Sequence, residues 1–367
     1  MEDNNSNIRI LVVNNGSTSI KVAGYENSNN LYEVELPIDS EKIKNYDSLY
    51  DQIGIRKQAI EEYISKRGES ISEYDVVACR GTSTIKGVKL CSGGYVINKD
   101  YVDMCYQIAT PHASTLGPIM TYEWMQEYKI LGFIYDAEGV NEFNDYATLS
   151  GHKDFPITPG SHTLNQKAAA RKCAERLGGK YEDYTLIVAH LGGGTSIALH
   201  DHGELVDSTS DGFSPTRMGG MPMLGMIGYT RECFSGKYTL NQLLKMMMND
   251  GGLVSYLGTS DLREVEQRIK EGDKEAEFYF NGMVYALAKD IGTMATVSSG
   301  KVDCIVLTGG MAYSKRLVQT LSDRVSFIAP VEVFAGSLEM EALAAGILRI
   351  MLGKEEPHFI KYKSCAI

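Results

Sequence analysis

The sequence lacks the features of a membrane protein, a disulfide-rich secreted protein or a nucleic-acid-binding protein. No run approaches the ~18 apolar residues of a membrane span. The seven cysteines contain no Cys-x-x-Cys pair and follow no spacing pattern, which is typical of reduced, structural thiols. Residues 1–5 are acidic and polar, so no secretory signal is expected. The formal net charge of -11 disfavours nucleic acid or an anionic membrane as the main partner. We therefore expect a cytoplasmic protein.

Several familiar site motifs are also missing. The sequence has no Gly-x4-Gly-Lys-[Ser/Thr] P-loop, and no Gly-x-Gly-x-x-Gly follows an apolar strand. These two solutions to nucleotide binding are therefore disfavoured. There is no Ser-His-Asp elbow and no clustered Cys/His metal site. The run His200-Asp201-His202 lacks further ligands at metal-site spacing, so it predicts a turn.

Two glycine-rich turns lined by hydroxyl groups are present, about half a chain apart. The first is Asn14–Lys21, which follows the apolar run 8–13; the second is His190–Ser196, which follows 186–189. Glycine lets backbone N–H groups approach an anion closely, and Ser and Thr hydroxyls add donors around it. One such turn could be a hairpin. Two of them suggest a duplicated fold that holds a polyphosphate between its halves.

The first turn has the side chains of a phosphate grip. If a strand leaves Gly16, then Ser17, Ser19 and Lys21 share one of its faces. Two hydroxyls and an ammonium group suit a β- or γ-phosphate. Asn14 stands where the preceding strand ends and could hold water or a metal ligand. A solvated hairpin is the alternative.

A third glycine turn, Thr308–Ser314, closes a strand and opens a helix. Backbone at such a position can approach a base or a ribose, with the helix N-terminus facing the ligand. A loop with a structural role only is the alternative.

The organisation of the chain predicts an α/β protein with mixed sheets, covering helices and two domains, because 367 residues exceed the usual size of one domain. Strands are expected at 8–13, 20–25, 31–37, 75–79, 130–135, 185–190, 195–200, 204–207 and 303–307. Helices are expected at 52–66, 114–127, 164–177, 275–297 and 339–352, with another after the third turn. Residues 82–95 indicate an exposed loop. The methionine-rich stretches at 218–226 and 246–248 predict packing, or alternatively a deformable wall for an apolar substrate.

Charged residues stand at the ends of the expected strands. Arg80 and Asp136 each follow an apolar run, and Arg217 lies in the loop 213–217. Functional groups of open α/β sheets tend to lie beyond strand ends. His112 and His162 lie in loops ahead of helices, where a lone histidine is more often a cap or a surface group. Together with the glycine turns, two arginines and an aspartate are what phosphoryl transfer requires.

These motifs resemble those of the acetate and butyrate kinases, within the sugar kinase, heat-shock chaperone and actin superfamily. The resemblance covers roughly residues 8–354 and is closest to the butyrate kinases. The segments that carry the resemblance are residues 164–168, 187–194, 211–215, 251–259, 305–314, 325–331 and 339–344.

The resemblance implies a duplicated ribonuclease H-like (actin-like ATPase) fold with a nucleotide cleft between two domains. The expected domains are 7–155, completed by the C-terminal helix 339–353, and 156–338. The implied reaction is ATP-dependent phosphorylation of a short-chain carboxylate, most directly butyrate, to its acyl phosphate, or the reverse. ATP/ADP and Mg²⁺ are the implied cofactors, within fatty-acid metabolism. A homodimer without a nucleic-acid or membrane partner is expected.

Motif position also assigns roles to residues. The resemblance implies catalytic roles for Arg80, Asp136, His162 and Arg217, and a substrate contact for His112. It implies nucleotide binding by Asn14, Ser17, Ser19, Lys21, His190, Gly192, Gly193, Gly194, Gly309, Gly310 and Met311. It implies Mg²⁺ binding by Asn14, Asp136 and Glu339.

The chain departs from the family pattern near several of these residues. Asn15 and Ile20 replace the usual Pro and Thr of the first turn, and Thr82 replaces a Gly after Arg80-Gly81. Branched C4–C5 acids and acetate are therefore alternative substrates. A nucleotide-binding relative without transferase activity is the alternative from another functional class.

Overall fold

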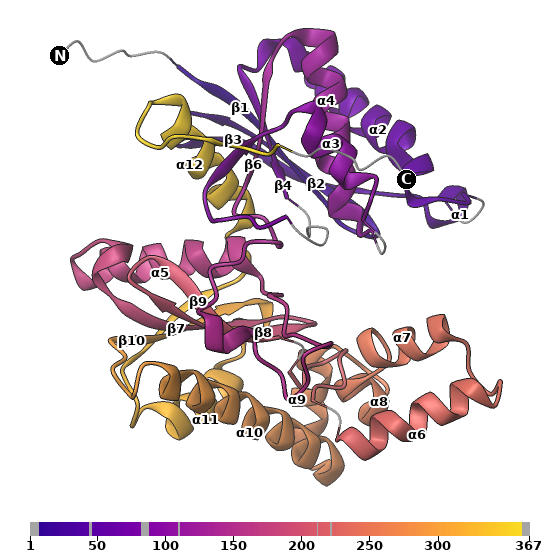
Figure 1. The fold of residues 1–367 in the computed structure, drawn as a ribbon, viewed down its shortest axis with the longest axis vertical. Coiled ribbons are helices and arrows are strands. Elements are labelled where there is room, and N and C mark those ends of the chain that lie inside the picture. The colour runs from indigo at the N-terminus through magenta and orange to yellow at the C-terminus, as the bar shows by residue number, and fades with distance from the viewer. Residues whose placement is uncertain are drawn as a thin grey trace. The chain divides into compact units, whose positions relative to one another are not determined.

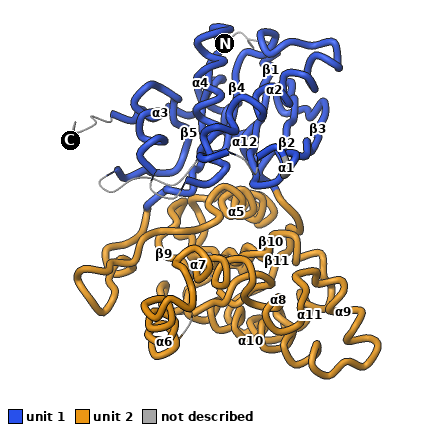
Figure 2. The backbone as a smooth tube through the Cα atoms, turned by 90° about the vertical axis from the view of Figure 1, so that its right-hand side faces the viewer, with its two compact units in different colours: residues 1–141, 338–367 blue, residues 142–337 orange. Residues whose placement is uncertain are grey.

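The computed structural model describes residues 7–43, 46–81, 88–108, 111–210, 212–220 and 222–361. The chain forms two compact units. Unit 1 comprises the chain up to Asn141 and from Leu338 on, and unit 2 comprises Glu142–Ser337 (Figure 2). Each unit has one β-sheet with helices packed on it (Figure 1), which confirms the α/β class. No described helix is both long and apolar enough to cross a membrane.

The sheet of unit 1 has the strand order β12-β5-β6-β4-β1-β2-β3. Its strands are β1 (Arg9–Asn15), β2 (Ser19–Glu26), β3 (Asn29–Pro37), β4 (Val76–Arg80), β5 (Gly94–Val96), β6 (Leu131–Tyr135) and β12 (His358–Phe359). β1, β2 and β3 are antiparallel neighbours, and β4 and β6 run parallel to β1. The five strands predicted in this part of the chain are all present. β5 falls inside the expected loop 82–95, of which residues 82–87 lie outside the described part.

Helices pack on both faces of this sheet. They are α1 (Ser40–Ile43), α2 (Ile53–Lys66), α3 (Lys99–Cys105), α4 (Leu116–Tyr128) and α12 (Glu339–Met351). Trp124 of α4 packs in one core with Val77 and Ile134. The neighbouring Tyr135 points to the opposite face, since side chains alternate along a strand. There α12 packs against it: a Cβ at Gly346 would lie 2.6 Å from the Tyr135 ring, so only glycine allows this approach.

The sheet of unit 2 has the order β11-β10-β7-β8-β9. Its strands are β7 (Thr185–Leu191), β8 (Thr195–Asp201), β9 (Glu204–Ser210), β10 (Cys304–Gly309) and β11 (Val331–Ala335). β7, β8 and β9 are antiparallel neighbours, and β10 and β11 run parallel to β7. This repeats, strand for strand, the arrangement β3-β2-β1-β4-β6 of unit 1. The duplicated fold is confirmed, and β11 was missed by the sequence patterns.

The helices of unit 2 are α5 (Thr163–Leu177), α6 (Met223–Phe234), α7 (Leu240–Met248), α8 (Gly252–Leu257), α9 (Leu262–Lys270), α10 (Lys274–Val297) and α11 (Lys315–Val325). α10 contributes Phe280 and Leu287 to a core that also contains Ile187 and Ile305 of the sheet. α5 contacts β7 and β10. α5, α10 and α11 were predicted, whereas α6–α9 were not.

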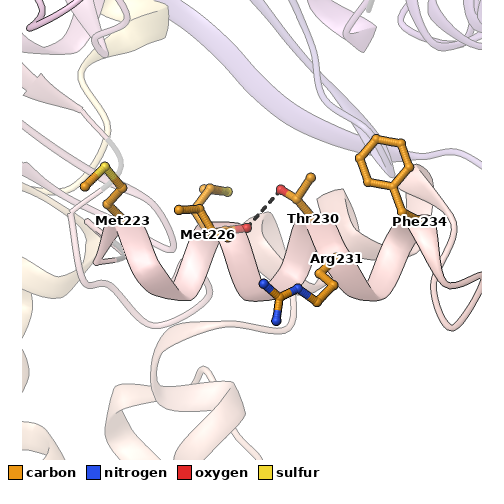
Figure 3. Close-up of a pocket in the computed structure, with 6 residues that line it drawn as sticks. Met223, Met226, Thr230, Arg231 and Phe234 are labelled. Carbon is orange, nitrogen blue, oxygen red and sulfur yellow. Dashed lines mark hydrogen bonds between the residues drawn. The ribbon is translucent and has the colours of Figure 1, made fainter.

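The methionine-rich helix α6 lies on the surface. Met223 is 76% exposed and Phe234 is 90% exposed, so the expected packing role is wrong for this helix. Its side chains line a shallow cavity of about 410 Å³ (Figure 3), and the Thr230 hydroxyl donates to the Met226 carbonyl. Met221 lies outside the described residues.

Candidate active site

The first glycine turn joins β1 to β2 in unit 1, as predicted. The Gly16 N–H donates to the Ser19 carbonyl at 2.9 Å and closes the turn. Arg56, in the first turn of α2, donates to the carbonyls of Gly16 at 2.9 Å and Ser17 at 3.2 Å. Sequence analysis missed Arg56, because an arginine in a polar helix ordinarily lies in solvent. Its side chain is instead fully buried beneath the turn.

The polar residues of this turn already have partners in unit 1. Ser19 donates to Glu35 at 2.5 Å, and Lys21 lies directly across the β2–β3 ladder from the same Glu35. The Ser17 hydroxyl lies 3.4 Å from His112 Nε2. His112 Nδ1 accepts from the Ser114 N–H, so His112 caps the short helical turn ahead of α4. The expected cap role of this histidine is therefore present, alongside its contact with Ser17.

Arg80 is held between two carboxylates at the end of β4. It pairs with Glu138, and its Nη1 lies 3.7 Å from Glu339 Oε1. Burial lowers the pKa of Arg80, but the two carboxylates more than offset this and raise it above its ordinary value. Asn14 donates to the other oxygen of Glu339 at 2.7 Å. Sequence analysis placed Asn14, Arg80 and Glu339 here and missed Glu138.

Asp136 follows β6 at the same edge of the sheet, because β4 and β6 are parallel neighbours with Arg80 opposite Tyr135. It is 1% exposed and adopts φ 42, a left-handed conformation uncommon outside glycine. The Asp136 N–H donates to the Gly93 carbonyl, and Asp136 Oδ1 accepts a hydrogen bond from the Gly93 N–H. This reciprocal pair fixes the carboxylate at the end of the strand. Strained backbone of this kind is concentrated at functional sites.

The second glycine turn joins β7 to β8 in unit 2. The Gly193 carbonyl accepts from the hydroxyls of Ser214 at 2.7 Å and Thr216 at 2.9 Å. The turn is thereby tied to the loop that carries Arg217. A Cβ at Gly194 would lie 2.7 Å from the Arg217 guanidinium carbon, so glycine at this position lets the two pack together.

Two predicted histidines of unit 2 are stacked. The rings of His162 and His190 lie 4.0 Å apart with an angle of 11° between their planes. His162 Nδ1 lies 2.7 Å from the Ser196 hydroxyl, and His190 Nδ1 lies 2.9 Å from the Asn165 amide nitrogen. Because an amide nitrogen can only donate, His190 Nδ1 is the acceptor and the proton of the neutral ring is on Nε2.

The third glycine turn lies directly against the second. Gly309 has φ 91, and a Cβ there would lie 2.4 Å from the Leu191 carbonyl oxygen. Both turns line one cavity of about 880 Å³ in unit 2. Its wall includes Gly192, Gly193, Pro215, Thr216, Glu266, Lys270, Gly310, Met311, Lys315 and Arg316. This volume is in the range typical of small-molecule sites.

The predicted residues thus divide between the two units. Asn14, Ser17, Ser19, Lys21, Arg80, His112, Asp136 and Glu339 belong to unit 1. His162, His190, Gly192, Gly193, Gly194, Arg217, Gly309, Gly310 and Met311 belong to unit 2. Within the described parts of the chain, no group of three or more His, Cys, Asp or Glu side chains is arranged to hold a metal ion.

Comparison with known proteins gives a consistent result. Residues 155–330 match the model of the Acetokinase family. The chain is 40% identical over 354 residues to the probable butyrate kinase 2 of Caldanaerobacter subterraneus subsp. tengcongensis, covering 95% of this chain and 98% of that one. It is 38% identical over 354 residues to butyrate kinase 1 of Clostridium acetobutylicum, with the same coverage.

Solved structures share the fold at lower identity. The acetate kinase of Porphyromonas gingivalis aligns with a TM-score of 0.73 at 19% identity, covering 94% of this chain and all of that one (100%). The acetate kinase of Entamoeba histolytica aligns with a TM-score of 0.75 at 16% identity, covering 92% of this chain and 98% of that one. The actin-like ATPase fold expected from the sequence is confirmed.

Proposed function

The chain belongs to the acetate and butyrate kinase family, and from this premise we propose that it transfers a phosphoryl group from ATP to a short-chain carboxylate. Butyrate is the proposed substrate, giving butanoyl phosphate and ADP in a reversible reaction. The observation that carries the proposal is the similarity to butyrate kinases along 95% of the chain.

The cavity of unit 2 supports the nucleotide part of the proposal. It is lined by two glycine turns and by the cations Lys270, Lys315 and Arg316. Glycine backbone can approach a phosphate or a ribose closely, and the cations attract a polyphosphate. We assign the phosphates to His190 and Gly192–Gly194, and the adenosine to Gly309–Met311.

The remaining residues supply positive charge and orientation. Arg217 packs on the second turn, and we assign it, with His162, to the phosphoryl group in transfer. In unit 1 we assign Arg80 and Asp136 to the reacting groups and the first turn (Asn14, Ser17, Ser19 and Lys21) to the nucleotide phosphates, with His112 on the carboxylate side. The proposal requires the groups of both units, since each unit alone lacks part of the set.

The reaction needs no general base, because the carboxylate nucleophile is already ionised at neutral pH. The obstacle is repulsion between two anions. Arginine and lysine side chains and backbone N–H groups that are fixed before the reaction hold both anions and stabilise the charge of the transition state.

The donor types in unit 1 support a Mg²⁺ site. Glu339 has a side chain that is 14% exposed and is held by the Asn14 amide group, and the Asp136 carboxylate is fixed at the end of β6. Carboxylate and amide oxygens are the ligands that Mg²⁺ prefers, and it usually takes one or two carboxylates together with substrate phosphates. We propose that Asn14, Asp136 and Glu339 hold the ion, which when bound would neutralise phosphate oxygens.

We further propose that the protein is a cytoplasmic homodimer in fatty-acid metabolism, with no nucleic-acid or membrane partner. The net charge of -11 supports the last point. Sedimentation equilibrium tests the dimer directly: a single 40.4 kDa species at micromolar concentration would contradict it.

The test of the activity is trapping of acyl phosphate with hydroxylamine, using ATP, Mg²⁺ and straight and branched acids of two to six carbons. We expect hydroxamate formation with butyrate above the other acids. A preference for branched acids or acetate would correct the substrate. ATP binding without hydroxamate from any acid would instead support the alternative of a nucleotide-binding relative that lacks transfer chemistry.

A further inference from the structure

Arg56 is a buried charge directly beneath the first glycine turn. Its side chain has no exposed surface. Nη1 donates to the Gly16 carbonyl and Nη2 to the Ser17 carbonyl, at 2.9 and 3.2 Å. Nε and Nη2 both donate to Gln52 Oε1, at 3.1 and 2.9 Å, and Nη1 lies 3.5 Å from Asn15 Oδ1.

None of these acceptors is a carboxylate. Among the described residues Arg56 is bonded only to neutral carbonyl and amide oxygens, whereas Arg80 is held by two acidic side chains. Burial lowers the pKa of Arg56, and no acidic group offsets this. Removing an ion from water costs several kcal/mol when no counter-ion accompanies it. The positive charge of Arg56 therefore lies beneath the first turn without an acidic partner among the described residues.

The bonds to Arg56 determine which way the turn presents its N–H groups. In a planar trans peptide the N–H points away from the C=O of the same unit. Since the carbonyls of Gly16 and Ser17 point to Arg56, the N–H groups of Ser17 and Thr18 point away from it. Both residues are exposed, and neither N–H donates to a described residue.

We propose that Arg56 is a positioning residue for phosphate binding, which acts through the first turn without touching the substrate. It fixes two backbone N–H groups toward the nucleotide phosphates and supplies a positive charge that no described counter-ion cancels. This inference rests on the proposed function, because it takes the first turn to be a phosphate site. Neutral peptide dipoles aligned by a buried cation attract an anion more strongly than a free turn does.

The decisive variant is Gln52→Glu, which keeps Arg56 and its geometry but supplies the missing counter-ion. We expect the thermal stability to be unchanged or higher. The KM for ATP and the Kd for ADP should both rise by roughly threefold to tenfold. The KM for the carboxylic acid should change much less. If the role of Arg56 is purely structural, the added carboxylate should leave nucleotide affinity unchanged.

Two further variants complete the test. Arg56→Met should weaken ADP binding by roughly tenfold or more, and Arg56→Lys should restore part of it. Arg9→Met, which breaks two ion pairs in the same unit, with Glu69 and with Glu73, controls for general destabilisation. If Gln52→Glu and Arg56→Met both bind ADP as the parent does, the proposal is wrong. Calorimetric ADP binding needs no turnover, so this result is separate from a failure of the kinase activity.

Discussion

His162 and His190 lie face to face, with ring centroids 4.0 Å apart, and each is oriented through its Nδ1 by a different neighbour. Ser196 holds the first ring and Asn165 holds the second. These neighbours fix the orientation of each ring.

Replacing Asn165 should therefore change the tautomer of His190. In the Asn165→Asp variant the partner of Nδ1 becomes a carboxylate, which draws the proton from Nε2 to Nδ1. We expect kcat/KM to fall by about tenfold to a hundredfold, because His190 Nε2 in the second turn no longer carries a proton that it can donate. Imidazole ¹⁵N shifts report the tautomer. Asn144→Asp, at a helix cap elsewhere in unit 2, is the matched control. An unchanged His190 tautomer would contradict the assignment.

Arg217 should affect the chemical step more than nucleotide binding. We expect Arg217→Ala to lower kcat on the order of a thousandfold, as for arginines that stabilise a phosphoryl group in transfer, with a much smaller loss of ATP affinity. Gly194→Ala should reproduce part of this effect, because the new Cβ displaces the guanidinium group. Steady-state kinetics with calorimetric ATP binding separates the two. An equal loss of ATP affinity would remove Arg217 from the transition-state role.

Glu138 and Glu339 both pair with Arg80, but only Glu339 is bonded to Asn14. We therefore expect Glu339→Gln to raise the Mg²⁺ concentration needed for half-maximal activity by roughly tenfold or more. Glu138→Gln removes the same formal charge and should leave the Mg²⁺ requirement nearly unchanged. Activity measured over a Mg²⁺ series at saturating ATP decides between them. If the Mg²⁺ requirement shifts equally in both variants, Glu339 acts by pairing with Arg80 and not by binding the ion.

We expect His200 to make the folded protein sensitive to acid. It is fully buried, with Nδ1 bonded to the Tyr181 hydroxyl at 2.6 Å. Burial, aided by the charge of Lys167, lowers its pKa well below 6.5, although Glu142 opposes the shift. The unfolded chain takes up a proton below pH 6.5 while the folded chain does not. The contribution of neutral His200 to the unfolding free energy is therefore fully present above that pH. It is lost as the pH falls, by up to about 1.4 kcal/mol per pH unit.

Urea unfolding of the parent and of His200→Gln between about pH 7.5 and pH 5 measures this effect. The variant should have a shallower loss of unfolding free energy over that range, since its amide group does not titrate. Parallel curves for the two proteins would show that other groups cause the acid sensitivity.

The edge of the unit 1 sheet shows how far sequence reasoning reaches. Arg80 and Asp136 follow apolar runs, and parallel strands bring their ends together, so pattern alone places both residues at one edge. The stacking of His162 on His190 had no such signal, because the two residues lie on different elements and meet only through the packing of α5 on β7. Asn165 lies in the segment 164–168 that carries the family resemblance, but the spacing of that segment does not predict the hydrogen bonds of its amide group to His190 and Thr308.

The misses have physical causes as well. α6 is rich in Met and Gly, so its apolar residues suggested burial, yet none of them is buried. Arg56 sits in a helix of low amphipathic contrast, and a buried arginine without an acidic partner contradicts the usual rule for charged residues. Glu138 follows a strand end by three residues, where side-chain direction depends on the unusual backbone of Asp136.

The division of the chain has a consequence for its synthesis. Unit 2 is one continuous segment, whereas unit 1 is completed by α12 and β12 at the far end of the chain. At ~5–20 residues per second, a ribosome needs about 10–40 s to make the intervening segment 142–337. During that interval the face of β1 and β4 that α12 later covers stays open on the nascent chain. Unit 1 therefore exposes apolar surface until the last helix of the chain has been made.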